Sequence, residues 1–144
     1  EALPLIRYRT HDIASITHEK CACGRTFVRM SKPVGRSDDM LIIRGVNVFP
    51  SQIENVLMSF SQVSPFYQLV VDRVNNLDIL EIRVEMTESM FSDEIRKIEE
   101  TAKKIKNEVQ SVLGIAVNIV LVEPHSLERT EGKSKRIIDK RTIK

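Results

Sequence analysis

Residues 130–136, Thr-Glu-Gly-Lys-Ser-Lys-Arg, place one lysine directly after a glycine in a polar stretch near the end of the chain. A lysine ammonium is a compact positive charge on a long, flexible stem. Lys133 can therefore reach a point where two anions meet and offset negative charge that develops in a transition state. Losing such a contact typically lowers a rate about a hundredfold or more. Lys135 and Arg136 beside it could attract phosphate groups, but we take both as solvated charges.

Two further polar segments carry side chains that could bind hydroxyl or phosphate groups. In residues 8–12, Tyr-Arg-Thr-His-Asp, the Asp12 carboxylate can accept hydrogen bonds from two hydroxyl groups. In residues 35–39, Gly-Arg-Ser-Asp-Asp, the planar fork of Arg36 suits phosphate or vicinal oxygens. Taken alone, Asp12 also fits a solvated loop, and residues 35–39 also fit an ordinary Asp-rich turn.

A third segment flanks Arg44-Gly45 with the apolar runs 40–43 and 46–49. This pattern predicts a small hairpin bent at the glycine. A backbone without a Cβ can pass close to a slender ligand, so the turn is a candidate binding element. The alternative is an ordinary hairpin that leads into a helix.

In this order, the segments resemble the carboxyl-terminal end of adenylate-forming acyl-CoA synthetases, most closely the phenylacetate–CoA ligases. The resemblance covers nearly the whole chain and is least generic around the Arg44-Gly45 turn. It implies that Lys133 bridges the carboxylate of the acid and the α-phosphate during adenylation. It further implies that Asp12 accepts the ribose hydroxyls and that Arg36 contacts the ribose and phosphate.

The same resemblance implies that Asp38 is the hinge between two domains. It also implies that Arg44, Gly45 and Val46 bind coenzyme A, where their loop lines the pantetheine tunnel. One position departs from the superfamily pattern, because His11 stands where a glycine is usual, and a side chain there removes backbone freedom.

Cys21 and Cys23 lie in a Cys-Ala-Cys-Gly sequence, which is half of a zinc site at most, since zinc takes four ligands. His18 is a candidate third ligand. The alternative is a pair of reduced cysteines in a tight glycine turn, in keeping with a cytoplasmic protein.

Composition restricts the class of protein. The chain has 144 residues, 42% hydrophobic and 29% charged, as expected for a soluble protein, and no apolar run approaches the ~20 residues of a membrane span. From Arg129 onward seven Lys/Arg stand against two Asp/Glu. The aromatic residues do not cluster among these basic ones, which disfavours nucleic-acid binding. The absence of an initial methionine suggests a fragment of a longer protein.

The hydrophobic pattern predicts an α+β fold with a boundary before Gly35. The residues before this boundary read as short extended pieces, with one strand expected over residues 5–9. The resemblance implies that residues 1–34 are the β-rich end of a larger amino-terminal adenylation domain and that residues 35–144 are a mobile lid domain.

In the lid we expect the hairpin and then a helix from Pro50 capped by Ser51 and Glu54, followed by strands at 66–72 and 79–86 joined by Asn75-Asn76. In the second of these strands the apolar residues from Leu80 to Met86 alternate with Glu81, Arg83 and Glu85, which predicts one buried and one solvent-facing side. A helix from Phe91, capped by Ser92 and ended by Gly114, and a strand at 116–122 complete the lid. Together these predict a small three-stranded antiparallel sheet with two packed helices.

The leading interpretation is the C-terminal part of an ATP-dependent phenylacetate (aryl acid)–CoA ligase, inactive when isolated. ATP, Mg2+ and coenzyme A are the expected cofactors, with zinc as a further candidate. The expected partners are small molecules, with a homodimer kept as an option and neither nucleic acid nor membrane. The alternatives are a related adenylate-forming enzyme with a different acceptor, a small basic α+β binding module, and a ligand-binding regulatory domain.

Overall fold

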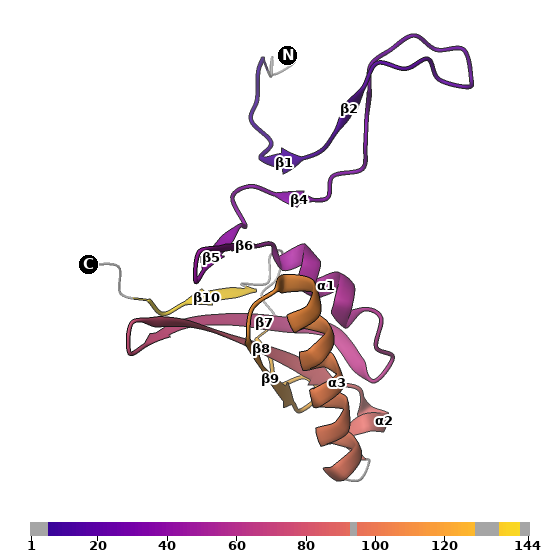
Figure 1. The fold of residues 1–144 in the computed structure, drawn as a ribbon. Coiled ribbons are helices and arrows are strands. Elements are labelled where there is room, and N and C mark those ends of the chain that lie inside the picture. Colours follow the sequence, from indigo (N-terminus) through magenta and orange to yellow (C-terminus); the bar gives the residue numbers. More distant parts are fainter. Residues whose placement is uncertain (1–5, 93–94, 129–135, 142–144) are drawn as a thin grey trace, which may run out of the picture. The chain divides into compact units, whose positions relative to one another are not determined.

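The computed structural model describes residues 6–92, 95–128 and 136–141 (Figure 1). Its contacts divide the chain into two compact units, Glu1–Met40 and Leu41–Lys144. No helix among the described residues is long and apolar enough to cross a membrane.

The first unit consists of two short antiparallel ladders. β1 (Asp12–Ile13) pairs with β4 (Gly35–Arg36), and β2 (Ile16–Thr17) pairs with β3 (Arg29–Met30). The strand expected over residues 5–9 is wrong for its described part, since residues 6–9 form no strand. Every described residue of this unit is at least partly exposed, so the unit contains no buried core of its own.

The second unit is built on one four-stranded sheet in the order β10-β7-β8-β9. β7 and β8 form an antiparallel hairpin, whereas β9 pairs parallel with β8 and β10 pairs parallel with β7. The bounds of these strands are β7 Val63–Val74, β8 Leu77–Met86, β9 Val117–Val122 and β10 Ile137–Asp139.

The predicted α+β class is confirmed, but the expected three-stranded antiparallel sheet is wrong in number and direction. A long helix lies between β8 and β9, and a crossover through a helix allows the two neighbouring strands to run parallel. β10 was missed because three residues after a polar segment carry too short a pattern to predict a strand.

Three helices complete the second unit: α1 Pro50–Leu57, α2 Glu88–Phe91 and α3 Ile95–Leu113. The predicted end of the long helix is confirmed, because Gly114 takes a left-handed φ of +69° and donates its N–H to the Gln110 carbonyl. The placement of Phe91 in this helix is wrong, because Phe91 belongs to the short α2, which has Thr87 at its amino-terminal cap and Ser92 at its carboxyl-terminal cap. The predicted cap of the long helix at Ser92 adjoins residues 93–94, which lie outside the described residues, and stays a prediction.

The expected capping of α1 by Ser51 and Glu54 is also wrong. Phe49 is the N-cap, and its backbone N–H donates to the Gln52 side-chain oxygen at 3.0 Å. Pro50 occupies the first helical position, where its fixed φ is favourable, so the predicted start at Pro50 is confirmed while the predicted cap is not. Glu54 is thereby left available for a different partner.

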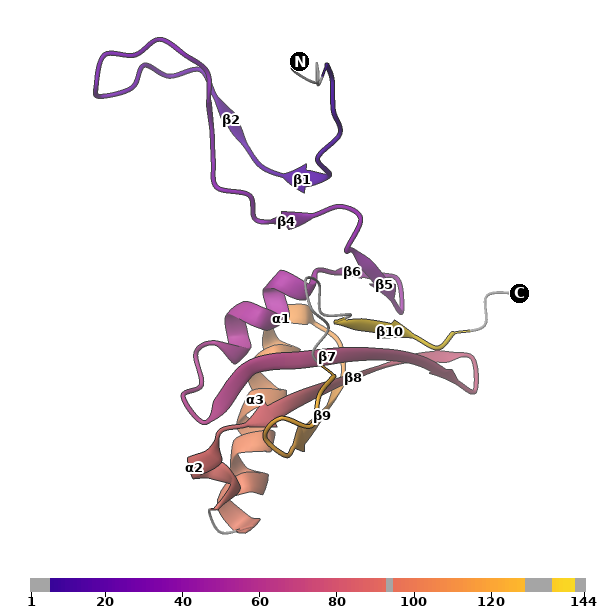
Figure 2. The same cartoon turned by 180° about the vertical axis from the view of Figure 1, so that it is seen from behind.

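The core of the second unit lies between the sheet and the two longer helices, which lie on the same face of the sheet (Figures 1 and 2). The predicted alternation along β8 is confirmed at Leu80, Ile82 and Val84, which are all fully buried. The predicted hairpin is present as β5 (Leu41–Ile43) and β6 (Val46–Val48), whose buried residues join this core. The hairpin is therefore part of the second unit.

Candidate functional site

In the first unit, the β1–β4 ladder places the two predicted nucleotide-binding side chains opposite each other. Asp12 is the direct cross-strand partner of Arg36. Opposed residues of an antiparallel pair project from the same face, with Cβ atoms roughly 5 Å apart. An acceptor for hydroxyl groups and a donor for phosphate thus lie side by side on one exposed ladder.

The predicted hinge residue is bonded directly to this pair. Arg36 donates from Nε to Asp38 Oδ1 at 3.0 Å and from Nη2 to Asp38 Oδ2 at 2.7 Å. These bonds lower the pKa of Asp38 below its ordinary value and raise that of Arg36. Both side chains are nearly half exposed, so the pair contributes little to stability and mainly orients the guanidinium.

His11 occupies the position where the resembling motif has a glycine, and its φ is +64°. This left-handed conformation favours glycine and is uncommon for other residues. It is held by Ser37, whose backbone N–H donates to the His11 carbonyl at 2.7 Å. The departure from the family pattern therefore changes the residue while the backbone keeps a glycine-like turn next to Asp12.

In the second unit, Arg44 and Gly45 form the predicted turn, with φ values of +52° and +79°. Two successive left-handed residues are typical of a type I′ hairpin turn. Both residues are exposed, while Val46 is half-buried and packs against the core. A Cβ added at Gly45 would meet no atom within 4 Å, so the turn is open to an approaching ligand.

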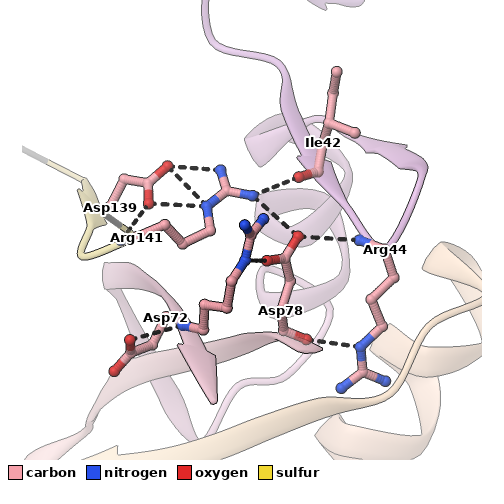
Figure 3. A network of polar contacts seen from close by, with 7 residues as sticks. Ile42, Arg44, Asp72, Asp78, Asp139 and Arg141 are labelled. Carbon is pink, nitrogen blue, oxygen red and sulfur yellow. Dashed lines mark hydrogen bonds and ion pairs between the residues drawn. The ribbon is translucent and has the colours of Figure 1, made fainter. Parts of the chain in front are cut away.

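Below this turn lies a network of carboxylates and arginines that the sequence did not reveal (Figure 3). Its centre is Asp78, near the start of β8, which is 9% exposed. Asp78 Oδ1 accepts from Arg73 Nε at 2.8 Å, and Asp78 Oδ2 accepts from Arg141 Nη1 at 3.2 Å. Arg141 also binds Asp139, with its Nη2 2.6 Å from Oδ2.

These contacts keep both carboxylates charged. The hydrogen bond from Arg73 is the main cause that lowers the pKa of Asp78. The hydrogen bond from Arg141 lowers the pKa of Asp139 in the same way and raises that of Arg141 itself. Hydrogen bonds to a charged form favour that form. At neutral pH the network is therefore a set of fixed, mutually compensating charges.

Lys133 lies outside the described residues, and its role stays a prediction. The described residues on either side of its segment are anchored. On one side, the Leu127 backbone N–H donates to Glu85 Oε1 at 2.9 Å. Glu85 is only 1% exposed, so its expected place on the solvent-facing side of the strand is wrong. The buried Glu85 carboxylate, near the end of β8, therefore holds the backbone at Leu127, shortly before residues 129–135.

On the other side, Arg136 donates to Glu54 Oε2 at 2.9 Å and lies over the Tyr67 ring at 5.2 Å from its centre. The Tyr67 hydroxyl also donates to Glu54, at 3.1 Å. Burial, with the nearby Glu54 charge, raises the pKa of Tyr67 to about 12. The expectation that Arg136 is merely solvated is therefore wrong. No separate signal in the sequence marks this cluster, because Glu54 in α1 is expected in the helix cap and Arg136 in solvent.

Cys21 and Cys23 lie in a tight glycine turn, which is the alternative to a zinc site. Both are unoxidised, Gly24 has a left-handed φ of +84°, and Cys23 Sγ donates to Cys21 Sγ at 3.1 Å. Hydrogen bonds from Cys23 lower the pKa of the Cys21 thiol. Within the described part of the chain, no group of three metal-binding side chains exists, so neither His18 nor another residue completes a zinc site there.

The predicted residues thus fall into two sets. Asp12, Arg36 and Asp38 are brought together in the first unit, whereas Arg44, Gly45 and Val46 lie on the hairpin of the second unit. Solved structures show what class of protein has this fold. The model resembles 2-hydroxyisobutyryl-CoA ligase in its postadenylation state, with a TM-score of 0.82, 36% identity, and coverage of 96% of this chain and 29% of that chain.

The same ligase solved with 2-HIB-AMP and CoA in the thioesterification state matches with a TM-score of 0.66 at 32% identity, over 94% of this chain and 28% of that one. The fold is therefore that of the carboxyl-terminal region of an adenylate-forming ligase. Residues 45–141 match the family model "AMP-binding enzyme C-terminal domain", and the chain belongs to this family.

Comparison with curated relatives identifies the kind of ligase that the chain resembles. The chain is 42% identical to the phenylacetate-coenzyme A ligase of Thermus thermophilus, over 98% of this chain and 35% of the relative. It is 43% identical to the phenylacetate-coenzyme A ligase of Escherichia coli, over 99% of this chain and 32% of the relative. The predicted resemblance to the carboxyl-terminal part of these ligases is confirmed, and the chain spans about a third of the length of these relatives.

Proposed function

We propose that this chain is the carboxyl-terminal part of an AMP-forming aryl-acid–CoA ligase, with phenylacetate as the leading substrate. The observation that carries the proposal is the similarity to phenylacetate-coenzyme A ligases over nearly the whole chain. The Asp12–Arg36 ladder and the open Arg44-Gly45 turn support it, because they supply the groups that a nucleotide and a slender thiol ligand would need.

The first proposed half-reaction joins the acid to ATP. A carboxylate oxygen attacks the α-phosphorus, and pyrophosphate leaves, which gives an acyl-adenylate. Asp12 would accept the ribose hydroxyls, and Arg36 would contact the ribose and phosphate oxygens. Lys133 would neutralise charge where the carboxylate meets the α-phosphate. Mg2+ would supply charge neutralisation for the triphosphate. Among the described residues there is no group of three metal-binding side chains, so no residue of this part of the chain is assigned to the ion.

The second proposed half-reaction transfers the acyl group to coenzyme A. The thiol sulphur attacks the adenylate carbonyl, the thiol proton is lost to solvent or a base, and AMP leaves. Arg44, Gly45 and Val46 would line the path of the pantetheine arm. Lys133 would act in the first step and the Arg44-Gly45 turn in the second. Replacing one by the other at the active site would require a conformational change of the lid, with Asp38 as the hinge.

The domain assignment belongs to the same proposal. Residues 1–34 would be the end of a larger amino-terminal domain, and residues 35–144 the lid. The absence of buried residues among those described in the first unit supports this, since exposed apolar side chains such as Phe27, Val28 and Met30 call for a covering layer. β4 pairs with β1, so the exact boundary is best placed within residues 35–40.

The decisive experiment uses the full-length enzyme and measures the two half-reactions separately. Lys133→Ala should lower acid-dependent pyrophosphate exchange about a hundredfold or more. It should leave acyl transfer from a supplied aryl-adenylate to coenzyme A much less affected. Lys135→Ala, two positions away, is the matched control and should stay near the wild-type rate. A panel of aryl acids then identifies the substrate.

Undiminished exchange in Lys133→Ala would refute the proposed role of that lysine. Exchange without any acyl-CoA product would instead favour the second candidate, an adenylate-forming enzyme with a different acceptor. The likeness to a ligase solved with both an adenylate and CoA favours coenzyme A as the acceptor.

A further inference from the structure

Asp78 contacts Arg44 of the Arg44-Gly45 turn at two points. Asp78 accepts the Arg44 backbone N–H through Oδ2 at 3.4 Å, and its own carbonyl accepts Arg44 Nε at 2.7 Å. Arg44 carries a side chain at a left-handed φ, where residues with a Cβ are uncommon. Both ends of Arg44, its amide and its guanidinium, are therefore fixed by one partner on β8 (Figure 3).

Asp78 is itself fixed by two further guanidinium groups. Arg73, near the end of β7, binds one carboxylate oxygen, and Arg141, after β10, binds the other. The Asp78 side chain is 10% exposed and that of Arg141 is 12% exposed, so water competes little for these contacts. A buried carboxylate with this many donors has one well-defined position.

Arg141 also contacts the hairpin strand β5. Its Nη1 donates to the Ile42 carbonyl on β5 at 2.8 Å, while Nε and Nη2 bind Asp139. The turn is thus connected through backbone and side-chain contacts to β8 and to the segment around β10. A hairpin with only its own three cross-strand pairs would not be fixed in this way.

We propose that Asp78 is a positioning residue for the acyl-transfer step, because it holds the Arg44-Gly45 turn in the conformation that admits coenzyme A. This inference rests on the proposed function. Asp78 contacts no substrate in this assignment. It acts through Arg44, and its loss should affect the step that uses the turn while leaving the step that uses Lys133 intact.

The test is Asp78→Asn in the full-length enzyme, since the amide keeps the size of the side chain but loses its charge and one acceptor. We expect the transfer of the acyl group from a supplied aryl-adenylate to coenzyme A to fall roughly tenfold to a hundredfold, because small misplacements of binding groups have effects of this size. The KM for coenzyme A should rise, and pyrophosphate exchange should stay within about twofold of wild type.

Asp72→Asn is the matched control. Asp72 lies on β7, and its Oδ1 accepts the neighbouring Arg73 backbone N–H at 2.7 Å. This variant should change neither half-reaction. Arg141→Lys is a second variant, since a lysine keeps the charge but cannot reach Ile42, Asp78 and Asp139 together. It should show the same selective loss as Asp78→Asn.

A measurement independent of activity separates this inference from the proposed function. In the full-length enzyme, Asp78→Asn should speed hydrogen exchange of the Arg44 amide, while Asp72→Asn should not. Unchanged exchange, or equal slowing of both half-reactions by Asp78→Asn, would overturn the positioning role. If the wild-type enzyme forms an aryl-adenylate but no acyl-CoA, the proposed function fails, whatever the exchange of the Arg44 amide shows.

Discussion

The buried Tyr67 side chain pairs through its hydroxyl with the partly exposed Glu54 and Arg136, and its ionisation should destabilise the second unit. Its pKa is raised to about 12 because burial and the Glu54 carboxylate disfavour a tyrosinate. In the unfolded chain the same group titrates near 10. Since the folded state holds the proton more tightly, the contribution is complete below about pH 10 and is lost as pH rises toward about 12.

The magnitude follows from these two values. A rise from 10 to about 12 corresponds to about 2.7 kcal/mol of folding free energy, an upper bound, of which about half is lost by about pH 11. Tyr67→Phe removes this dependence but also removes the hydrogen bond to Glu54. A hydrogen bond to a charged group is worth about 1.5–3 kcal/mol, and we take the low end because Arg136 still pairs with Glu54.

Wild type should therefore be about 1.5 kcal/mol more stable than Tyr67→Phe at about pH 8, and the two should be nearly equal at about pH 11. Urea unfolding followed by the circular dichroism of α3 measures this gap. The chain has two tyrosines and no tryptophan, so an ultraviolet absorbance titration of a Tyr8→Phe variant reports Tyr67 alone. Stability curves that stay parallel over this pH range, or a tyrosine that titrates near 10, would refute the reasoning.

Three further predictions concern other anchors. Glu85→Ala should lower the free energy of unfolding by about 1–3 kcal/mol, because the Leu127 N–H loses its acceptor, and Glu85→Gln should cost less; chemical denaturation measures both. His11→Gly should keep pyrophosphate exchange within about twofold in the full-length enzyme, whereas the β-branched His11→Val should lower exchange and melting temperature. Folding lowers the pKa values of Asp78 and Asp139, so their contribution to the free energy of unfolding should be complete above about pH 4 and should be lost as the pH falls below it. In the same denaturation assay, the free energy of unfolding of Asp139→Asn should decrease less steeply with falling pH.

The parts of the fold that depend on local backbone rules could be predicted from the sequence. Asn75-Asn76 and Arg44-Gly45 both form two-residue turns with left-handed conformations. Gly114 ends α3 as expected, and the alternation along β8 gives its buried face. In each case the signal lies within a few residues of the structure it specifies.

The parts that depend on distant partners could not be predicted. β10 pairs with β7, more than sixty positions earlier in the chain, and no local pattern marks three residues as a parallel strand. Glu54 and Arg136 are 82 positions apart, and Asp78 and Arg141 are 63 apart. Charged residues in such pairs read as solvated in the sequence, since burial of a charge becomes favourable only when its partner is present.

These distant contacts connect β10 to both proposed functional parts of the lid, the segment that carries Lys133 and the Arg44-Gly45 turn. β10 begins directly after Arg136, which closes the segment that carries Lys133, and it is followed by Arg141, which reaches the hairpin strand and Asp78. Backbone bonds pin the strand at both ends, from the Leu69 N–H to the Arg136 carbonyl at 2.7 Å and from the Lys140 N–H to the Val71 carbonyl at 2.8 Å. A change that loosens β10 should therefore slow both half-reactions, whereas loss of the Asp78 carboxylate should slow only the transfer to coenzyme A.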